Sequence, residues 1–199
     1  MIKGIDVSDN NGKVNWQAVA DSGIEFVMVA CSFGKTGRHD RFAENVNGAH
    51  ALGLKVGAYH YSYALTPADA LLEVENCKAA IEEAGVGLEL PVFFDMEDAD
   101  HWKEEHGFDF SPENITAICK NFIDHIGLKT GVYASEDWLT NKIDWQSLGC
   151  SIWNAEWLDP GQDPEDNPDG DSIKGYIWQY TNRFEIDGKF FDADIMYEE

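Results

Sequence analysis

The segment LPVFFDMEDAD, residues 90–100, combines the pattern of a buried strand with a cluster of acids. An uninterrupted apolar run ends at Asp95, Met96 and Glu97, and Asp98 and Asp100 follow closely. Such a run is typical of a strand that is buried on both faces within a parallel sheet. The acids have two interpretations: either the chain leaves the core for water, or carboxylates are held at the mouth of a site. The segment alone leaves both open.

Short apolar strands alternate with amphipathic helical segments along the rest of the chain. We expect strands over residues 2–8, 25–32, 55–64, 90–97, 129–135, 150–157 and 175–181, and a final strand or hairpin over 188–196. Helices are expected over residues 14–23, 41–53, 67–85 and 111–127. Thr66 and Ser111 precede Pro67 and Pro112, which is the signature of a helix N-cap followed by proline at the first helical position.

This alternation predicts an α/β fold with a parallel sheet covered by helices. A doubly wound sheet and a closed barrel both fit, and the regular spacing of the strands favours the barrel. Little room remains for full helices after residue 135, and 199 residues is short for a standard eight-fold barrel of about 250. We therefore expect residues 1–199 to form a single catalytic domain, a reduced TIM-like (β/α) barrel with about eight strands and fewer than eight helices.

The charge of the chain excludes some partners. It carries 37 acidic and 14 basic residues, a formal net charge of −23. Nucleic acid and anionic lipid both require a basic face, so neither is expected to bind. No apolar run approaches the length of a membrane span, and MIKGIDVSDN lacks the pattern of a signal peptide. We expect a monomer without membrane insertion.

Cysteines and the acidic loop give weak signals. The four cysteines form no C-x-x-C pair and no zinc pattern with nearby histidines, so we expect buried free thiols, although the sequence leaves a disulfide open.

The segment DPGQDPEDNPDGD, residues 159–171, suggests a calcium site by its acids. Its spacing does not match an EF-hand loop and Pro164 and Pro168 interrupt it, so a solvated surface loop is expected.

Acids and aromatic residues recur where the expected strands end. In a parallel barrel, the carboxyl ends of the strands form the active face. Acids at these ends are Asp6, Asp95, Glu97 and Glu156, and aromatic residues there are Tyr59, His60, Tyr61, Tyr133, Trp178 and Tyr180. His60 is expected to be a core or rim residue with its polar groups satisfied. The seven tryptophans suggest stacking surfaces for sugars, although many belong to the core.

Asp95 and Glu97 lie two residues apart on one strand, so they point to the same side, with α-carbons roughly 6–7 Å apart. Repulsion in a dry pocket would raise the pKa of one of them, which could then act as a general acid. Glycoside hydrolysis uses such a pair. No nucleophile elbow, P-loop, dinucleotide fingerprint or HExxH motif appears, and we expect no metal and no cofactor.

With these residues assembled, the chain resembles the glycoside hydrolase family 25 lysozymes, the Chalaropsis-type N-acetylmuramidases. The resemblance is carried by GIDVSDNNGKVNW, the segment from FVMVACS to HYSYA, PVFFDMED, SIWNAEW and WQYT, which together span nearly the whole chain. It implies a flattened barrel and cleavage of the β-1,4 bond between N-acetylmuramic acid and N-acetylglucosamine. The partner would be bacterial peptidoglycan, and the site of action the bacterial cell wall.

The resemblance also implies roles for individual residues. Glu97 would be the general acid and base, Asp95 its partner, and Asp6 the acid of the first strand. Asp192 would be the fourth acid, with Asp194 standing where asparagine is usual. Substrate contacts would come from Tyr59, Tyr61, Tyr133, Trp178, Tyr180 and Asp194. A covalent intermediate and assistance by the substrate's acetamido group both remain open as mechanisms.

The chain departs from the family pattern at two places. It has ACSFGK where threonine and glutamate are frequent, and SDNNG where an aromatic residue and glutamine are frequent. Two alternatives are retained: a catalytically silent wall-binding barrel, and a chitinase-like glycosidase. The chitinase motif would require acids where Leu90 and Phe93 stand, so the residues disfavour it.

Overall fold

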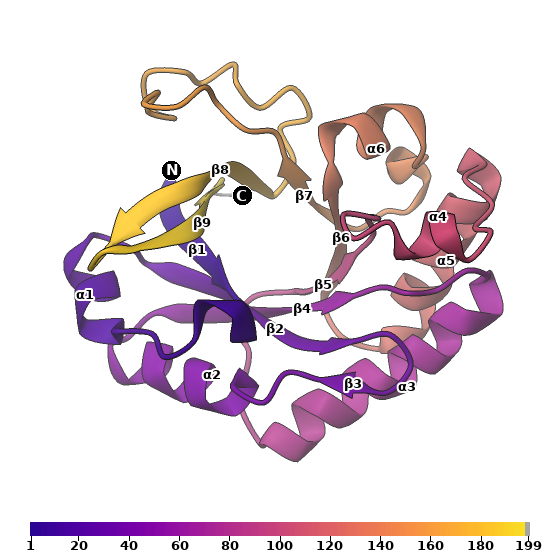
Figure 1. The fold of residues 1–199 in the computed structure, drawn as a ribbon, viewed down its shortest axis with the longest axis horizontal. Coiled ribbons are helices and arrows are strands. Elements are labelled where there is room, and N and C mark those ends of the chain that lie inside the picture. Colours follow the sequence, from indigo (N-terminus) through magenta and orange to yellow (C-terminus); the bar gives the residue numbers. More distant parts are fainter. Residues whose placement is uncertain (198–199) are drawn as a thin grey trace.

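The computed structural model describes residues 1–197 and contains a closed barrel of eight strands (Figure 1). The strands of the barrel are β1 (Ile2–Val7), β2 (Phe26–Phe33), β4 (Lys55–Tyr61), β5 (Val92–Asp95), β6 (Thr130–Ser135), β7 (Ser151–Ala155), β8 (Ile177–Ile186) and β9 (Lys189–Met196). A two-residue strand, β3 (Gly37–Arg38), pairs with the end of β2. All barrel pairings are parallel except those of β9, which runs antiparallel to β1 and β8. The expected reduced α/β barrel is confirmed.

Six α-helices accompany the eight strands in residues 1–197. They are α1 (Trp16–Asp21), α2 (Phe42–Ala51), α3 (Pro67–Ala84), α4 (Trp102–Glu105), α5 (Pro112–Ile126) and α6 (Glu136–Asn141), with 3-10 turns η1 (Asp9–Asn11) and η2 (Trp145–Ser147). In Figure 1, α2 and α3 run along the lower side of the barrel, and β8 and β9 form the opposite wall without a helix between them. Thr66 and Ser111 cap α3 and α5 through their side chains, as predicted.

Side-chain alternation separates two apolar layers, because successive residues of a strand face opposite sides of the sheet. The larger layer lies between the strands and the helices and includes Val27, Phe94 and Trp178. The smaller layer fills the inside of the barrel, with Phe26, Met28, Leu90, Phe93, Tyr133, Trp153, Ile177 and Met196. The barrel interior is therefore packed at one level, which provides a floor for the functional residues at the carboxyl ends of the strands.

The C-terminal hairpin closes the barrel. β8 continues to Ile186, five residues beyond the expected strand, and turns at Asp187 and Gly188 into β9. Both turn residues have positive φ, 52° and 72°, as the two-residue turn of a twisted hairpin requires. β9 then pairs with β1, with Asp192 opposite Asp6. This pairing brings acids from the two ends of the chain together.

The segment of residues 159–171 is a loop without helix or strand, and it stands away from the barrel at the top of Figure 1. The expectation of a solvated surface loop is wrong for Asp171, which is completely buried. Its Oδ1 accepts hydrogen bonds from Nδ2 of Asn154 at 2.8 Å and from the amides of Ile173 and Lys174. Asp171 therefore anchors the end of the loop to β7.

The cysteines are free thiols, and Cys31 and Cys77 lie with their sulfurs 3.7 Å apart between β2 and α3. Cys150 is only partly buried, unlike the other three. Within residues 1–197, no His, Cys, Asp and Glu side chains form a group of three that could hold a metal ion. None of the helices in this range is both long and apolar enough to cross a membrane.

Candidate active site

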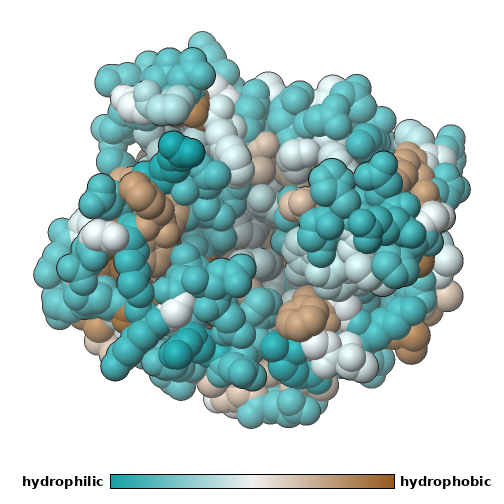
Figure 2. Space-filling view, in the orientation of Figure 1, coloured by the Kyte–Doolittle hydropathy of each residue, from teal (hydrophilic) through white to brown (hydrophobic). Residues whose placement is uncertain are grey.

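A cleft of about 630 Å³ opens at the carboxyl ends of the barrel strands. Figure 2 shows the hollow in the middle of this face, surrounded mainly by hydrophilic residues. The side chains that line it come from all eight barrel strands and from the loops that follow β1, β3, β4 and β5. They include four acids predicted from the sequence: Asp6, Asp95, Glu97 and Asp192.

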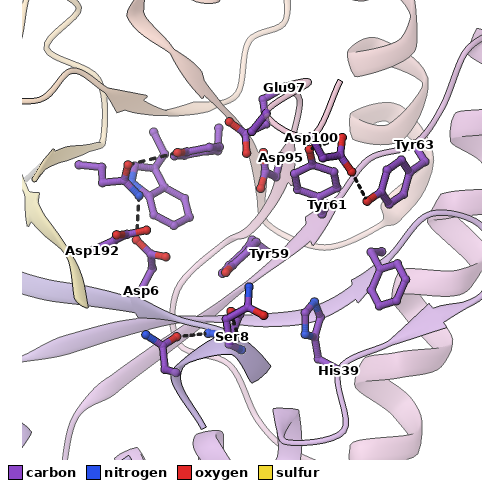
Figure 3. Close-up of a pocket in the computed structure, with 17 residues that line it drawn as sticks. Asp6, Ser8, His39, Tyr59, Tyr61, Tyr63, Asp95, Glu97, Asp100 and Asp192 are labelled. Carbon is purple, nitrogen blue, oxygen red and sulfur yellow. Dashed lines mark hydrogen bonds between the residues drawn. The ribbon is translucent and has the colours of Figure 1, made fainter. Parts of the chain in front are cut away.

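The four acids form two facing pairs (Figure 3). Asp6 and Asp192 are register partners on β1 and β9, and their side chains lie next to each other. Asp95 ends β5 and Glu97 follows two residues later, on the other side of the cleft. Asp6 and Asp95 are buried, whereas Glu97 and Asp192 are partly exposed to the cleft. Glu97 is thus the member of its pair that a substrate can reach more easily.

Burial and mutual repulsion oppose the simultaneous ionisation of all the carboxyl groups in the cleft. Burial raises the pKa of Asp95 well above its usual range, and the neighbouring Glu97 raises it further. Burial also raises the pKa of Glu97, an effect that Lys103 offsets in part. The pKa of Asp6 is raised by burial and then by Asp192 and Asp194. Protons are therefore retained in this cleft under conditions in which exposed carboxyls have lost theirs.

Gln179 of β8 joins the two halves of the cleft. Its Nε2 donates to Oδ2 of Asp6 at 2.8 Å. Its Oε1 accepts from the hydroxyl of Tyr133 at 3.2 Å and from Nε1 of Trp157 at 2.9 Å. The buried amide therefore orients one acid, one cleft tyrosine and one tryptophan whose side chain is largely exposed, at 55%.

Aromatic side chains form much of the cleft wall. Tyr59, Tyr61 and Tyr133, all predicted, line it. The hydroxyl of Tyr63 donates to Asp100 at 2.7 Å, and its ring packs edge-on against Trp102 at 5.0 Å between centroids. Trp153 lies on the floor between Tyr59 and Tyr133. Rings of this kind present apolar faces beside hydroxyl groups, which suits a sugar chain.

Three residues predicted to contact substrate lie elsewhere. Trp178 and Tyr180 face outward from β8 into the layer outside the barrel, because Gln179 between them faces inward. Trp178 is completely buried and donates from Nε1 to the carbonyl of Glu156 at 2.7 Å. Asp194 lies beneath the cleft, fully buried, and accepts from Nε1 of Trp153 at 2.8 Å. The structure therefore does not place these side chains in the cleft wall.

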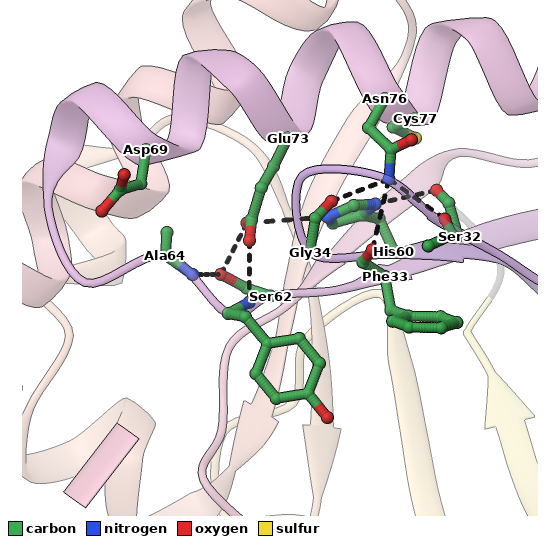
Figure 4. A network of polar contacts seen from close by, with 12 residues as sticks. Ser32, Phe33, Gly34, His60, Ser62, Ala64, Asp69, Glu73, Asn76 and Cys77 are labelled. Atoms are coloured by element: carbon green, nitrogen blue, oxygen red, sulfur yellow. Dashed lines mark hydrogen bonds and ion pairs between the residues drawn. The ribbon is translucent and has the colours of Figure 1, made fainter. Parts of the chain in front are cut away.

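Two further polar residues at strand ends are also outside the cleft. Glu156 binds the amide and hydroxyl of Ser172, both at 2.8 Å, and so supports the β7–β8 loop. His60 is buried behind the cleft, where its Nδ1 contacts Oγ of Ser32 at 2.8 Å and its Nε2 lies 3.5 Å from Glu73 (Figure 4). The expected core position is confirmed, but the polar groups are not all satisfied, because Nε2 of His60 is buried without a hydrogen-bond partner among residues 1–197.

Gln179, Trp157, Trp153 and Lys103 are among the residues at or beside the cleft that the sequence reasoning missed. Gln179 and Trp157 lie in predicted strand segments, but their polar link is a tertiary contact. Trp153 was predicted only as part of a strand, and the alternation of side chains along β7 places it inside the barrel. Lys103 resembles a surface residue in the segment HWKEEHG, yet it is completely buried. No local pattern identifies these contacts in advance.

Comparison with known proteins identifies the family of the chain. The family model described as "Glycosyl hydrolases family 25" matches residues 5–189. The chain belongs to glycosyl hydrolase family 25. A curated relative of this family 25 chain, the autolytic lysozyme of Clostridium acetobutylicum, is 27% identical over 159 residues, which are 78% of this chain and 45% of the relative.

A second relative of the family 25 chain is the N,O-diacetylmuramidase of Arthroderma benhamiae, 28% identical over 154 residues, which are 73% of this chain and 60% of the relative. The chain thus spans about half the length of these curated relatives. Among solved structures, the modular autolysin LytC from Streptococcus pneumoniae in complex with a synthetic peptidoglycan ligand superposes with a TM-score of 0.81 at 20% identity. That match covers 98% of this chain and 46% of LytC, and it shows a shared fold.

Proposed function

We propose that the chain is a lysozyme-type glycoside hydrolase, an N-acetylmuramidase that cleaves the β-1,4 bond between N-acetylmuramic acid and N-acetylglucosamine. The observation that carries the proposal is the set of four acids, Asp6, Asp95, Glu97 and Asp192, which face one aromatic-walled cleft. The two curated relatives named above are a lysozyme and a diacetylmuramidase, which supports peptidoglycan as the substrate.

Glu97 is the general acid in this proposal, because burial raises its pKa and its side chain, unlike that of Asp95, is accessible from the cleft. It gives that proton to the glycosidic oxygen as the bond from C1 to this oxygen breaks. Positive charge then develops at C1, and the ionised acids facing it stabilise this charge. In the second step water attacks C1, and the Glu97 carboxylate takes up its proton, which restores the acid.

Asp95 orients the substrate in this account. Its Oδ1 is buried and has no hydrogen-bond donor among residues 1–197, although it belongs to a residue that lines the cleft. A buried carboxylate oxygen normally has a donor. The acetamido N–H of the sugar is a suitable one, and holding it would direct the acetamido oxygen toward C1. The position of Asp95 beside Glu97 therefore supports the acetamido-assisted route over direct attack by a carboxylate.

Trp157 extends the binding surface in this proposal. It is exposed, yet its Nε1 is fixed by Gln179, so the indole face is held in one orientation at the β7 side of the cleft. A rigid aromatic face binds the apolar face of a pyranose without a large loss of side-chain entropy. We assign Trp157 to a sugar further along the glycan strand, because it does not line the central part of the cleft.

The enzyme acts as a monomer at the bacterial cell wall. Purified cell walls incubated with the chain should release soluble fragments, and mass analysis of their reducing ends should find N-acetylmuramic acid. Reducing N-acetylglucosamine ends would show a glucosaminidase instead. Binding to walls without any release would favour the catalytically silent barrel.

A further inference from the structure

Lys103 is the one lysine or arginine in residues 1–197 whose side chain is completely buried. It lies in α4, a single turn of helix just after the acidic end of β5, with Trp102 and Glu104 as neighbours in sequence. Asp98 fixes this turn by accepting from the backbone amides of Lys103 and Glu104, at 2.7 and 3.0 Å. Burying an ammonium group is unfavourable unless it is paired, so its position calls for a role.

The ammonium group binds the ends of two neighbouring strands. Its Nζ donates to the backbone carbonyl of Ser62, directly after β4. It also donates, at 2.5 Å, to the carbonyl of Glu97, two residues after the end of β5. It also lies 5.5 Å from the ring centroid of Tyr61 and 5.9 Å from that of Tyr63. Lys103 thus sits behind the cleft wall and holds the backbone of the proposed general acid.

Carboxyl groups face this ammonium from both sides. Asp95 and Glu97 face it from the cleft, Asp98 lies on its own loop, and Glu73 approaches from α3. Glu73 is held in place by the hydroxyl of Ser62 and the amide of Tyr63, both at 2.8 Å, and lies near His60 (Figure 4). The Cys119 thiol of α5 is a further titratable group near the ammonium.

We propose that Lys103 is a positioning residue for catalysis, which fixes the Glu97 backbone and supplies the positive charge that keeps Asp95 ionised beside a protonated Glu97. This inference rests on the proposed muramidase function. The charge role follows from the position of the ammonium: its hydrogen bond to the Glu97 carbonyl places it next to the acid pair, and a cation there favours loss of a proton from a buried carboxyl group. Without this cation the pKa values of both acids would be higher, and the cleft would more readily lose the anion that orients or stabilises the sugar.

The matched pair Lys103→Met and Lys142→Met tests the proposal. Both variants remove one positive charge and keep an unbranched side chain of similar length. Lys142, however, lies at the end of α6 over the ring of Trp138, away from the cleft. Lys103→Met should move the acid limb of the pH profile of kcat/KM upward by about one pH unit, with about tenfold lower activity on that limb. Lys142→Met should leave the profile in place.

A lower activity of Lys103→Met at every pH with an unmoved profile would overturn the charge role. Titration of the Asp95 carboxyl by carbon NMR gives a readout that does not depend on turnover, and its pKa should be higher in Lys103→Met than in the native chain. An equal pKa in both proteins would contradict the proposal.

Two results separate this inference from the proposed function. Native protein that releases no wall fragments would refute the function, while the NMR titration would still decide whether Lys103 affects Asp95. If Lys103→Met does not fold, nitrogen NMR of the native protein decides the question. The Nζ of Lys103 should be an ammonium throughout the active pH range, and a neutral amine there would overturn the inference.

Discussion

Gln179 donates a 2.8 Å hydrogen bond to Asp6 across 173 residues of sequence, from β8 to β1. The two strands are not neighbours, because β9 lies between them in the sheet. The bond therefore spans the inside of the barrel and fixes the relative positions of an acid and the aromatic residues Tyr133 and Trp157, which share the other end of the amide.

Loss of this amide should disturb catalysis. Gln179→Leu keeps the approximate volume but removes the donor that lowers the pKa of Asp6 against the effects of burial and of Asp192. We expect kcat/KM to fall by about tenfold, with the largest loss at acidic pH, where Asp6 then holds its proton. Kinetics across pH 4–8 on soluble glycan measure this. Gln17→Leu on the exposed face of α1 is the control, and equal losses in both variants would argue against the role of Gln179.

Replacing Asp95 should stabilise the fold at neutral pH. The folded-state pKa of Asp95 is raised by burial and by Glu97. Its favourable contribution to the free energy of unfolding is therefore complete below its unfolded pKa of about 3.9, and declines as pH rises through the folded pKa. Asp95→Asn removes this penalty and should raise the melting temperature at pH 7 by about 2–4 °C, equivalent to about 1 kcal/mol. At pH 3.5 the gain should disappear. Asp166→Asn, in the exposed loop, should show no gain at either pH.

Removal of the exposed indole should weaken substrate binding more than chemistry. Trp157→Ala is expected to raise KM for long glycan strands about fivefold while kcat changes little, because stacking contributes about 1 kcal/mol in both ground and transition states. Phe190→Ala, another exposed aromatic at 62%, is the control and should leave KM unchanged. A drop in kcat with constant KM would place Trp157 in the chemical step instead.

Activity should depend on pH and salt. The net charge of −23 opposes approach to anionic cell-wall polymers, and moderate salt screens this repulsion. The raised pKa of Glu97 also favours mildly acidic conditions, where it keeps its proton. We expect release from walls to rise between about 20 and 150 mM salt and to be highest at mildly acidic pH. A profile that is flat from acid to alkaline pH would contradict the assignment of an acid pair.

Much of the barrel could be predicted because its strands are continuous apolar runs and its main helices carry their own end signals. Asp6, Asp95, Glu97 and Asp192 were found for the same reason, since they stand where these runs end or, for Asp192, where the family resemblance places an acid. Their gathering in one cleft then follows from parallel strands sharing one active end.

The failures occurred where tertiary packing reverses a local expectation. In the segment WQYT, residues 178–181, the apolar side chains would usually face the interior and the polar one the solvent. Here the layer outside the barrel is apolar and the mouth inside is polar, so Gln179 faces inward and Trp178 and Tyr180 face outward. Lys103 was missed because its burial depends on tertiary contacts, the backbone carbonyls of Ser62 and Glu97 that follow two neighbouring strands.

The most direct test of the central claim is release of muramic-acid reducing ends from purified cell walls by the native chain and by Glu97→Gln. This change keeps the shape of the side chain but removes the proton donor, and general acid catalysis contributes about 10²–10⁴-fold. We predict a loss in that range for Glu97→Gln, with native-like release by Glu104→Gln, because the Glu104 side chain on α4 is exposed. Equal release by Glu97→Gln and the native chain would contradict the account.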